Sequence, residues 1–222
     1  MADIKAIVFD VYGTLFDVES IQKACEQHFP GKGEAVSSLW RSKQLEYAFL
    51  RQLMGQYEPF NIVTKDALSY ALEIHECSYS DEVVQDLMDA YNQLLPYEET
   101  EEILRHFQDK KLAVFSNGPD EMLDPLLRNA GFRDYFDAVV SVDEIKQYKP
   151  TTASYAYLLK QLHVRRGEVL FLSSNGWDIA GAANFGFHTA WINRKGAPAD
   201  RLGHKPNMEY NDLNGLIEEN NL

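Results

Sequence analysis

The sequence predicts an α/β fold built on a doubly wound parallel sheet, with an α-helical cap inserted after the first strand. Short apolar runs rich in β-branched residues recur along the chain, as expected for buried strands of a parallel sheet. Helical patterns separate the later runs, and such alternation is typical of doubly wound sheets. The interval after the first run breaks the alternation, because it offers long amphipathic patterns and no clear strand.

The first expected strand covers residues 4–9 and opens the core. The later strands are expected at 112–115, 138–142, 169–172 and 189–192. A helix is expected at 119–130, because Pro119 stands at a first-turn position and Gly131 follows the pattern. Residues 152–163 carry apolar side chains at helical spacing, and residues 196–206 have the composition of a surface loop.

The inserted segment contains amphipathic patterns at 36–53, 65–77 and 81–94. No repeat, low-complexity tract or Gly/Ser-rich linker separates it from the rest, so it is expected to pack on the core. We therefore predict a core of residues 1–16 and 92–222 and a helical cap of residues 17–91.

Composition narrows the classes of function. The chain has 222 residues, 45% of them hydrophobic, which is enough for a sizeable core. Its net charge of −13 comes from 21 Lys and Arg against 34 Asp and Glu, and it disfavours nucleic acid and anionic membranes as partners. A small-molecule substrate fits this balance.

The two cysteines, Cys25 and Cys77, are too few for a disulfide framework and suit a reducing compartment. The first ten residues meet an acid after a short apolar run, so we expect neither a signal peptide nor a membrane span there. These features predict a cytoplasmic protein.

Polar residues stand directly after the expected strands, where ligands of an open parallel sheet bind. They are Asp10 after the first strand, Ser116 and Asn117 after the second, Lys149 after the third, and residues 173–178 after the fourth. Each alone could be a turn residue or a helix cap. Turn chemistry alone does not explain four such groups in this order.

The groups read DVYGTL at 10–15, SNG at 116–118 and SSNGWD at 173–178. With them the chain resembles the haloacid dehalogenase superfamily, and within it the L-2-haloacid dehalogenases. The resemblance spans nearly the whole chain. It implies a Rossmann-like core, Asp10 as nucleophile, no cofactor and a homodimer, and the apolar and aromatic content of residues 40–57 is compatible with a dimer contact.

A carboxylate such as Asp10 at a strand end can attack as a nucleophile and form an ester that water later hydrolyses. Taken alone, Asp10 would be an ordinary turn or N-cap residue. Phosphatases of the superfamily usually carry a second Asp where this chain has Tyr12, and an acidic metal ligand where it has Ser174. The two replacements remove a general acid and an oxygen ligand for a hard cation, so a site without a metal is expected.

The resemblance also supplies roles for the other residues. Lys149 would keep Asp10 ionised, Arg41 would bind the leaving halide, and Asp178 would position Lys149 or the hydrolytic water. The residues implied in catalysis are Asp10, Thr14, Lys149, Ser173, Asn175 and Asp178. Those implied in binding the substrate or halide are Tyr12, Arg41, Leu45, Phe60, Ser116, Asn117, Tyr155 and Trp177.

Structural explanations stand beside these roles. Lys149 before a proline could be a surface turn, and Arg41 an ordinary exposed helix residue. Ser173 and Asn175 could cap the next helix, Asp178 could be a first-turn acid, and the aromatic residues and Tyr155 could be core. The six histidines show no metal-ligand spacing, and the acidic residues at 98–102 read as the first turn of a helix.

The favoured function is hydrolysis of short-chain L-2-haloalkanoic acids to D-2-hydroxyalkanoic acids and halide, through an aspartyl ester with inversion at C2. The alternatives are a phosphatase of the same superfamily and a non-catalytic member. Tyr12 and Ser174 argue against the first, and the retained Asp10, Lys149 and Asn175 argue against the second.

Overall fold

The computed structural model describes residues 3–218. Within them lies a six-stranded sheet in which all neighbouring strands are parallel, in the order β5–β4–β1–β6–β7–β8. The strands are β1 (Ala6–Phe9), β4 (Lys111–Ser116), β5 (Ala138–Ser141), β6 (Val169–Ser173), β7 (His188–Ile192) and β8 (Met208–Tyr210). The predicted doubly wound α/β core is confirmed.

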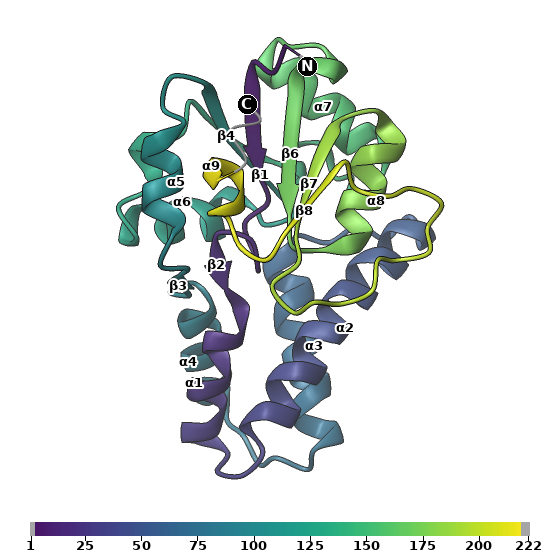
Figure 1. Cartoon of the computed structure of the whole chain (residues 1–222). Coiled ribbons are helices and arrows are strands. Elements are labelled where there is room, and N and C mark those ends of the chain that lie inside the picture. The colour runs from purple at the N-terminus through teal and green to yellow at the C-terminus, as the bar shows by residue number, and fades with distance from the viewer. Residues whose placement is uncertain (1–2, 219–222) are drawn as a thin grey trace.

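Helices flank this sheet. In Figure 1, α5 and α6 lie to the left of the strands, and α7 and α8 lie to the right. The helices of this half are α5 (Thr100–His106), α6 (Asp120–Asn129), α7 (Thr152–Leu162), α8 (Gly176–Phe185) and α9 (Gly215–Glu218). Short 3₁₀ turns precede or follow several strands, at η2 (Arg133–Tyr135), η3 (Val142–Ile145) and η4 (Arg166–Glu168).

Four helices follow β1 in the chain and occupy the lower half of Figure 1. They are α1 (Ile21–His28), α2 (Gly33–Met54), α3 (Phe60–Ile74) and α4 (Asp81–Tyr91), preceded by the 3₁₀ turn η1 (Val18–Ser20). A short antiparallel ribbon of β2 (Phe16–Asp17) and β3 (Leu95–Pro96) brackets them. The chain thus passes from the sheet half to these four helices and back through this ribbon.

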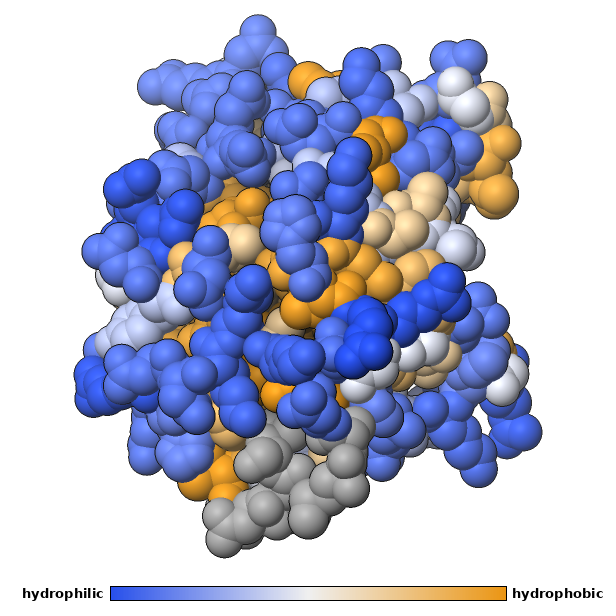
Figure 2. All heavy atoms as spheres, turned by 90° about the horizontal axis from the view of Figure 1, so that it is seen from above, coloured by the Kyte–Doolittle hydropathy of each residue, from blue (hydrophilic) through white to orange (hydrophobic). Residues whose placement is uncertain are grey.

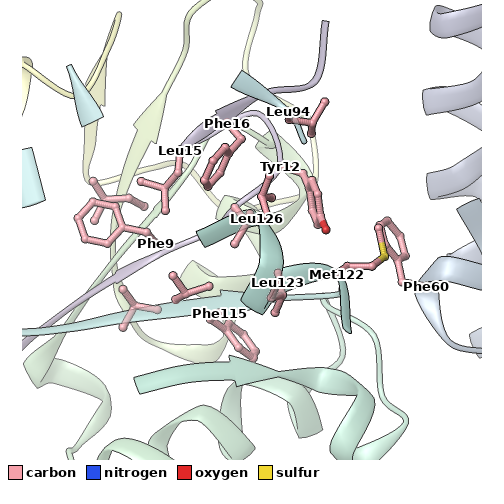
Figure 3. Packing of buried hydrophobic residues seen from close by; sticks show 14 of the residues in the cluster. Phe9, Tyr12, Leu15, Phe16, Phe60, Leu94, Phe115, Met122, Leu123 and Leu126 are labelled. Atoms are coloured by element: carbon pink, nitrogen blue, oxygen red, sulfur yellow. The ribbon is translucent and has the colours of Figure 1, made fainter. Parts of the chain in front are cut away.

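The core is continuous between the two halves. All four residues of β1 are fully buried. Figure 3 shows Phe60, from the start of α3, facing Tyr12 and Met122 on the sheet side, and the ring centroids of Tyr12 and Phe60 are 6.0 Å apart. Burying apolar side chains at this junction fixes the helical half over the carboxyl ends of the strands.

The end of the molecule at the top of Figure 1, away from the four helices, has a mainly polar surface. Figure 2, seen from above in the orientation of Figure 1, shows mostly hydrophilic side chains with apolar ones scattered among them. In residues 3–218, no helix combines the length and the apolar character that crossing a bilayer requires.

Several boundaries differ from those predicted. β5 ends at Ser141 because its hydroxyl accepts from the Asp143 amide and starts a 3₁₀ turn at Val142. α3 begins at Phe60 rather than 65, directly after Pro59, whose ring restricts the backbone before the first turn. The helices α1 and α9, the ribbon and β8 were not predicted, since each element is at most eight residues long. The loop at 196–206 carries no helix or strand and is largely exposed, as predicted.

Candidate active site

The candidate site lies where the strand order reverses. β1 pairs with β4 on one side and with β6 on the other, and the chain builds outward from it in both directions. Asp10 follows β1, while Ser116 and Ser173 are the last residues of β4 and β6. The crevice outside these carboxyl ends is the usual ligand position in open α/β sheets.

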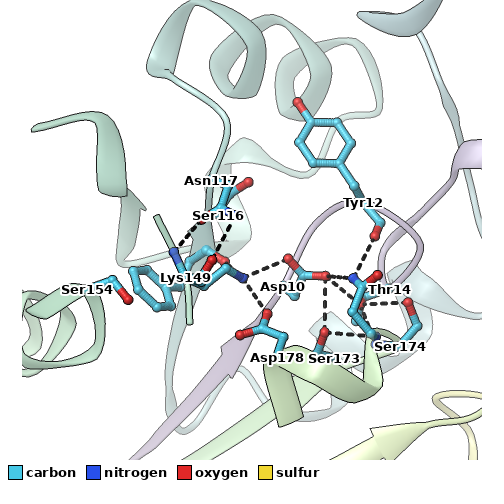
Figure 4. Close-up of polar contacts among 12 residues, drawn as sticks. Asp10, Tyr12, Thr14, Ser116, Asn117, Lys149, Ser154, Ser173, Ser174 and Asp178 are labelled. Carbon is cyan, nitrogen blue, oxygen red and sulfur yellow. Dashed lines mark hydrogen bonds and ion pairs between the residues drawn. The ribbon is translucent and has the colours of Figure 1, made fainter. Parts of the chain in front are cut away.

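A tight turn after β1 presents the Asp10 carboxylate. Gly13 has a φ of +89°, and a Cβ there would lie 2.8 Å from Ser174 Oγ, so only glycine suits the position. The turn places Thr14 Oγ1 3.1 Å from Asp10 Oδ2, as donor. Ser173 Oγ and Asn175 Nδ2 also donate to Oδ2, at 3.2 and 2.9 Å. The motifs at 10–15 and 173–178 therefore meet at one carboxylate oxygen (Figure 4).

The other oxygen of Asp10 belongs to a buried ion cluster. Lys149 Nζ donates to Asp10 Oδ1 at 2.9 Å, to Asp178 Oδ2 at 2.6 Å and to the Phe115 carbonyl at 3.0 Å. Burial by itself would lower the pKa of Lys149, but the attraction of the two carboxylates outweighs it and raises that pKa above its ordinary value. The ammonium is therefore fixed in its charged form beside the Asp10 carboxylate.

Asp178 is fully buried in the first turn of α8. Burial raises its pKa to about 6, against the lowering effect of Lys149 and with a further raising effect of Asp10. The Tyr155 hydroxyl donates to Asp178 Oδ1 at 2.7 Å. Tyr155 is itself fully buried and is not among the cavity-lining residues, so its expected place among the substrate-binding groups gives way to a place behind Asp178.

A small cavity opens in front of Asp10. Both halves of the chain contribute to its lining, with Arg41 and Leu45 from α2, Phe60 from α3, and Trp177 from α8. The full lining is Asp10, Tyr12, Arg41, Leu45, Phe60, Ser116, Asn117, Lys149, Asn175 and Trp177. The structure thus gathers at one cavity every residue expected to bind the substrate or halide except Tyr155.

The cavity wall is apolar on one side and carries donors on the other. Burial raises the pKa of Tyr12 well above its ordinary value, so its hydroxyl stays neutral. Trp177 packs edge-on against Phe49 with centroids 5.0 Å apart. Its indole Nε1 is buried and has no hydrogen-bond partner within residues 3–218. An unpaired buried donor next to a cavity suits an anionic ligand.

Ser116 and Asn117 shape the turn after β4. The Ser116 hydroxyl accepts from the Gly118 amide at 3.1 Å, a local side-chain to backbone hydrogen bond that is common for serine in turns. The Asn117 side-chain oxygen accepts from the Lys149 amide at 2.8 Å, and its Nδ2 donates to the Lys149 carbonyl at 3.5 Å. Asn117 therefore fixes the backbone that carries Lys149 and also lines the cavity.

Arg41 reaches the site from α2. Its Nη2 donates to Asn175 Oδ1 at 3.4 Å, and Asn175 in turn donates to Asp10. Its Nη1 donates to Gln44 Oε1 at 2.7 Å. Gln44 and the nearby Tyr91 were not predicted as site residues. The spacing of three from Arg41 places Gln44 on the same helix side, but a mid-helix glutamine carries no chemical signature of its own.

The donor set around Asp10 is poor in ligands for a hard cation. Tyr12 and Ser174 are neutral where the resemblance implies acids in the phosphatases of the superfamily, and the Ser174 amide N–H donates to Thr14 Oγ1 at 2.8 Å. Within residues 3–218, no group of three or more His, Cys, Asp or Glu side chains is arranged to hold a metal ion. The acidic residues at 98–102 lie instead at the start of α5, with Glu101 and Glu102 in its first turn.

The fold and the residues gathered at the carboxyl ends of its strands are those of one class of protein. The family model for haloacid dehalogenase-like hydrolases matches residues 4–186, and the chain belongs to that family.

The relatives locate the chain more closely. It is 42% identical to the (S)-2-haloacid dehalogenase of Pseudomonas sp. (strain YL) over 97% of this chain and 94% of that protein. It is 48% identical to the (S)-2-haloacid dehalogenase of Xanthobacter autotrophicus, over 86% of this chain and 76% of that protein. These matches confirm the branch that the sequence motifs indicated.

Solved structures agree. The L-2-haloacid dehalogenase from Xanthobacter autotrophicus with chloropropionic acid covalently bound superposes with a TM-score of 0.91, at 38% identity, and the alignment covers 99% of this chain and 100% of that one.

Proposed function

We propose that this protein hydrolyses short-chain L-2-haloalkanoic acids to D-2-hydroxyalkanoic acids and halide. A carboxylate oxygen of Asp10 attacks C2 from the side opposite the halogen, the carbon–halogen bond breaks, and the halide leaves with the electron pair. Water then adds to the ester carbonyl carbon, and the bond from that carbon to the substrate oxygen breaks. One proton of the water goes to that oxygen, which gives the hydroxy acid, and the other goes to solvent, so that Asp10 returns as a carboxylate. Only the first step touches C2, so the configuration there inverts once.

One observation carries the proposal: Asp10 lines a small cavity together with two cations, while neutral residues stand at the acidic positions of the superfamily phosphatases. A halide leaves without protonation, so the displacement step needs no general acid at the position of Tyr12. A phosphate ester would need both the acid and a hard cation. The covalently bound chloropropionic acid of the Xanthobacter autotrophicus structure supports the same route.

The two carboxylate oxygens of Asp10 accept hydrogen bonds from different donors, and from this difference we infer a role for each oxygen. Oδ2 accepts from Thr14, Ser173 and Asn175, whereas Oδ1 accepts from Lys149. We assign the attack to Oδ1, which has fewer donors competing for its lone pairs. Oδ2 then becomes the ester carbonyl oxygen, and its three donors stabilise the negative charge that water addition creates.

The helical segment completes the site. Residues 17–91, which we propose as the cap, contribute Arg41, Leu45 and Phe60 to the cavity. Arg41 meets the departing halide, and the Trp177 indole N–H supplies a further donor to the anion. Leu45, Phe60 and Tyr12 exclude water around the nucleophile. Ser116 and Asn117, at the turn after β4, hold the substrate carboxylate.

The first test is halide release from the two enantiomers of 2-chloropropionate, with and without EDTA. We expect release from the L enantiomer at equal rates in both conditions, slow reaction of the D enantiomer, and poor hydrolysis of aryl phosphates. Strict dependence on Mg²⁺, together with efficient phosphate hydrolysis, would favour the phosphatase instead. Absence of all turnover would favour a non-catalytic member.

The second test follows oxygen. With enzyme in excess over L-2-chloropropionate in ¹⁸O-water, the first hydroxy acid formed should carry little label in its new hydroxyl, and the peptide containing Asp10 should gain it. Complete labelling of that hydroxyl in the first turnover would mean direct attack by water. Asp10 would then be a general base and no ester would form.

We also propose that the protein is a homodimer in the cytoplasm. Leu50, Leu53 and Met54 on α2 and Ile62 on α3 are exposed, with Leu53 84% accessible. An exposed apolar patch of this kind suits a protein contact. Sedimentation of the wild type and of Leu53→Glu tests the dimer, and cell fractionation tests the location. A monomeric wild type would contradict the assembly.

A further inference from the structure

Arg41 is held in an unusual way for a cation beside a catalytic carboxylate. Within residues 3–218 it makes no ion pair with an Asp or Glu side chain within 4.0 Å. The atoms that receive its hydrogen bonds are neutral: Gln44 Oε1 at 2.7 Å, the Tyr91 hydroxyl at 3.5 Å and Asn175 Oδ1 at 3.4 Å. Its charge is therefore oriented without being cancelled.

A buried chain of hydrogen bonds sets the direction of the Gln44 amide. Gln44 Nε2 donates to Thr64 Oγ1 at 2.7 Å, and the Thr64 hydroxyl donates to the Phe60 carbonyl at 2.6 Å. Gln44 and Thr64 are fully buried. Since the Thr64 proton is used on Phe60, its oxygen must accept from the amide nitrogen, which turns the amide oxygen toward Arg41.

Tyr91 supports the same oxygen from α4. Its hydroxyl donates to Gln44 Oε1 at 3.1 Å. Its ring packs between Trp40 and Tyr12, with centroid distances of 5.3 and 5.6 Å. The Tyr91 ring is thus held by Trp40 of α2 and by Tyr12 of the turn after β1. Tyr91 therefore connects Gln44, which it contacts through its hydroxyl, with Tyr12 of the cavity lining.

We propose that Gln44 and Tyr91 are positioning residues that hold the Arg41 guanidinium through neutral oxygens, so that its full charge is available to the leaving halide. This inference rests on the proposed function. A carboxylate at the place of Gln44 would form a charge-assisted pair with Arg41 and oppose the attraction of the anion. A missing support would let the long side chain occupy other rotamers, and orientation would be lost.

The experiment uses four single variants of the full chain. Gln44→Glu changes the charge but keeps the shape, Gln44→Met removes the acceptor, and Tyr91→Phe removes one hydroxyl while keeping the ring. Gln85→Glu adds the same charge on the exposed surface of α4 and is the matched control. Circular dichroism and melting curves identify variants that remain folded. If Gln44→Glu does not fold, Gln44→Met and Tyr91→Phe decide.

We expect kcat for L-2-chloropropionate to fall roughly ten- to hundredfold in Gln44→Glu and about two- to tenfold in Tyr91→Phe. KM should change little, since the charge acts on the leaving group. Gln85→Glu should match the wild type. In an Arg41→Ala background, Gln44→Met should cost no further activity, because its effect passes through Arg41. An equal loss in both backgrounds would overturn the proposal.

Bromide binding gives a readout that does not need turnover. Titration with bromide, followed by tryptophan fluorescence, should show weaker binding in Gln44→Glu than in the wild type by a similar factor. If the wild type releases no halide from any haloacid, the proposed function fails and the bromide titration alone decides the positioning role. Unchanged bromide affinity in Gln44→Glu and Gln44→Met would overturn it.

Discussion

The two cations of the site, Lys149 and Arg41, sit in opposite electrostatic surroundings. Lys149 is fully buried between two carboxylates, at 2.9 Å from Asp10 and 2.6 Å from Asp178. Arg41 comes from a helix of the other half and is bound by amide and phenol oxygens. The charge of Lys149 is compensated by two carboxylates before substrate binds, whereas the charge of Arg41 has no carboxylate partner among the described residues.

The difference follows from when each charge is needed. A buried carboxylate nucleophile must be ionised before substrate arrives, so its counter-ion has to be permanent. Charge on the halide develops only as the carbon–halogen bond breaks, and an interaction that strengthens at that moment lowers the barrier. An Arg41 already paired with an acid would offer less to the transition state.

Asp10→Asn should have the largest effect. The neutral amide is a poor nucleophile, and turnover should fall by about 10⁴-fold or more. The fold should persist, because the amide replaces a carboxylate of the same shape. The rate of halide release measures turnover, and the melting temperature measures whether the fold persists. A variant that kept more than a hundredth of the wild-type rate would remove Asp10 from covalent catalysis.

Lys149→Met should have the second largest effect, on both stability and turnover. It leaves Asp10 and Asp178 buried without their cation, which should cost about 3–5 kcal/mol of stability at neutral pH. Turnover should fall by at least about 100-fold through the disturbed nucleophile. The stability loss should shrink as the pH falls below 6, where protonation relieves the repulsion. Urea unfolding at pH 5 and pH 8 checks this, and equal losses at both would contradict it.

Arg41→Lys should have an intermediate effect. The charge remains, but an ammonium cannot reproduce the planar fork that Gln44 and Asn175 hold, and kcat should fall roughly tenfold to hundredfold. Stability should change by less than about 1 kcal/mol, because no buried carboxylate loses a partner. Steady-state kinetics separates an effect on kcat from an effect on KM. A rise in KM with unchanged kcat would make Arg41 a ground-state binder.

Asp178→Asn should change how the stability of the protein depends on pH. The folded pKa of Asp178 is raised to about 6 from 3.8, so between these values the folded state binds more protons than the unfolded state. The contribution of this carboxyl to stability is therefore present at low pH and declines as the pH rises to 6, by at most about 1.4 kcal/mol per unit.

Urea unfolding of the wild type and Asp178→Asn from pH 4.5 to 7.5 measures that slope. The stability of the wild type relative to the variant should fall as the pH rises toward 6 and then level off. A relative stability that instead rises over this window would mean that the attraction of Lys149 dominates the titration of Asp178.

Much of this site is visible in the sequence because its signals are local. Apolar runs followed at once by Asp10, Ser116 and Ser173 predict that these residues share one edge of a parallel sheet, and the register of β1, β4 and β6 places them there. The positive φ of Gly13 in the turn after β1 is a finding of the structure. Short elements such as α1 and β8 lack such signals, and they were missed.

The residues on which the proposed chemistry rests can be read from their positions in the chain: an acid after the first strand, a lysine, a helix arginine, and neutral residues where a metal site would need acids. How each charge is compensated depends on the folded arrangement, because the partners belong to segments far apart in the chain. Lys149 and Asp10 are separated by 139 residues, and Arg41 and Asn175 by 134. The same packing put Tyr155 behind Asp178 and turned an unremarkable Gln44 toward Arg41, since burial forces each polar atom to find a partner.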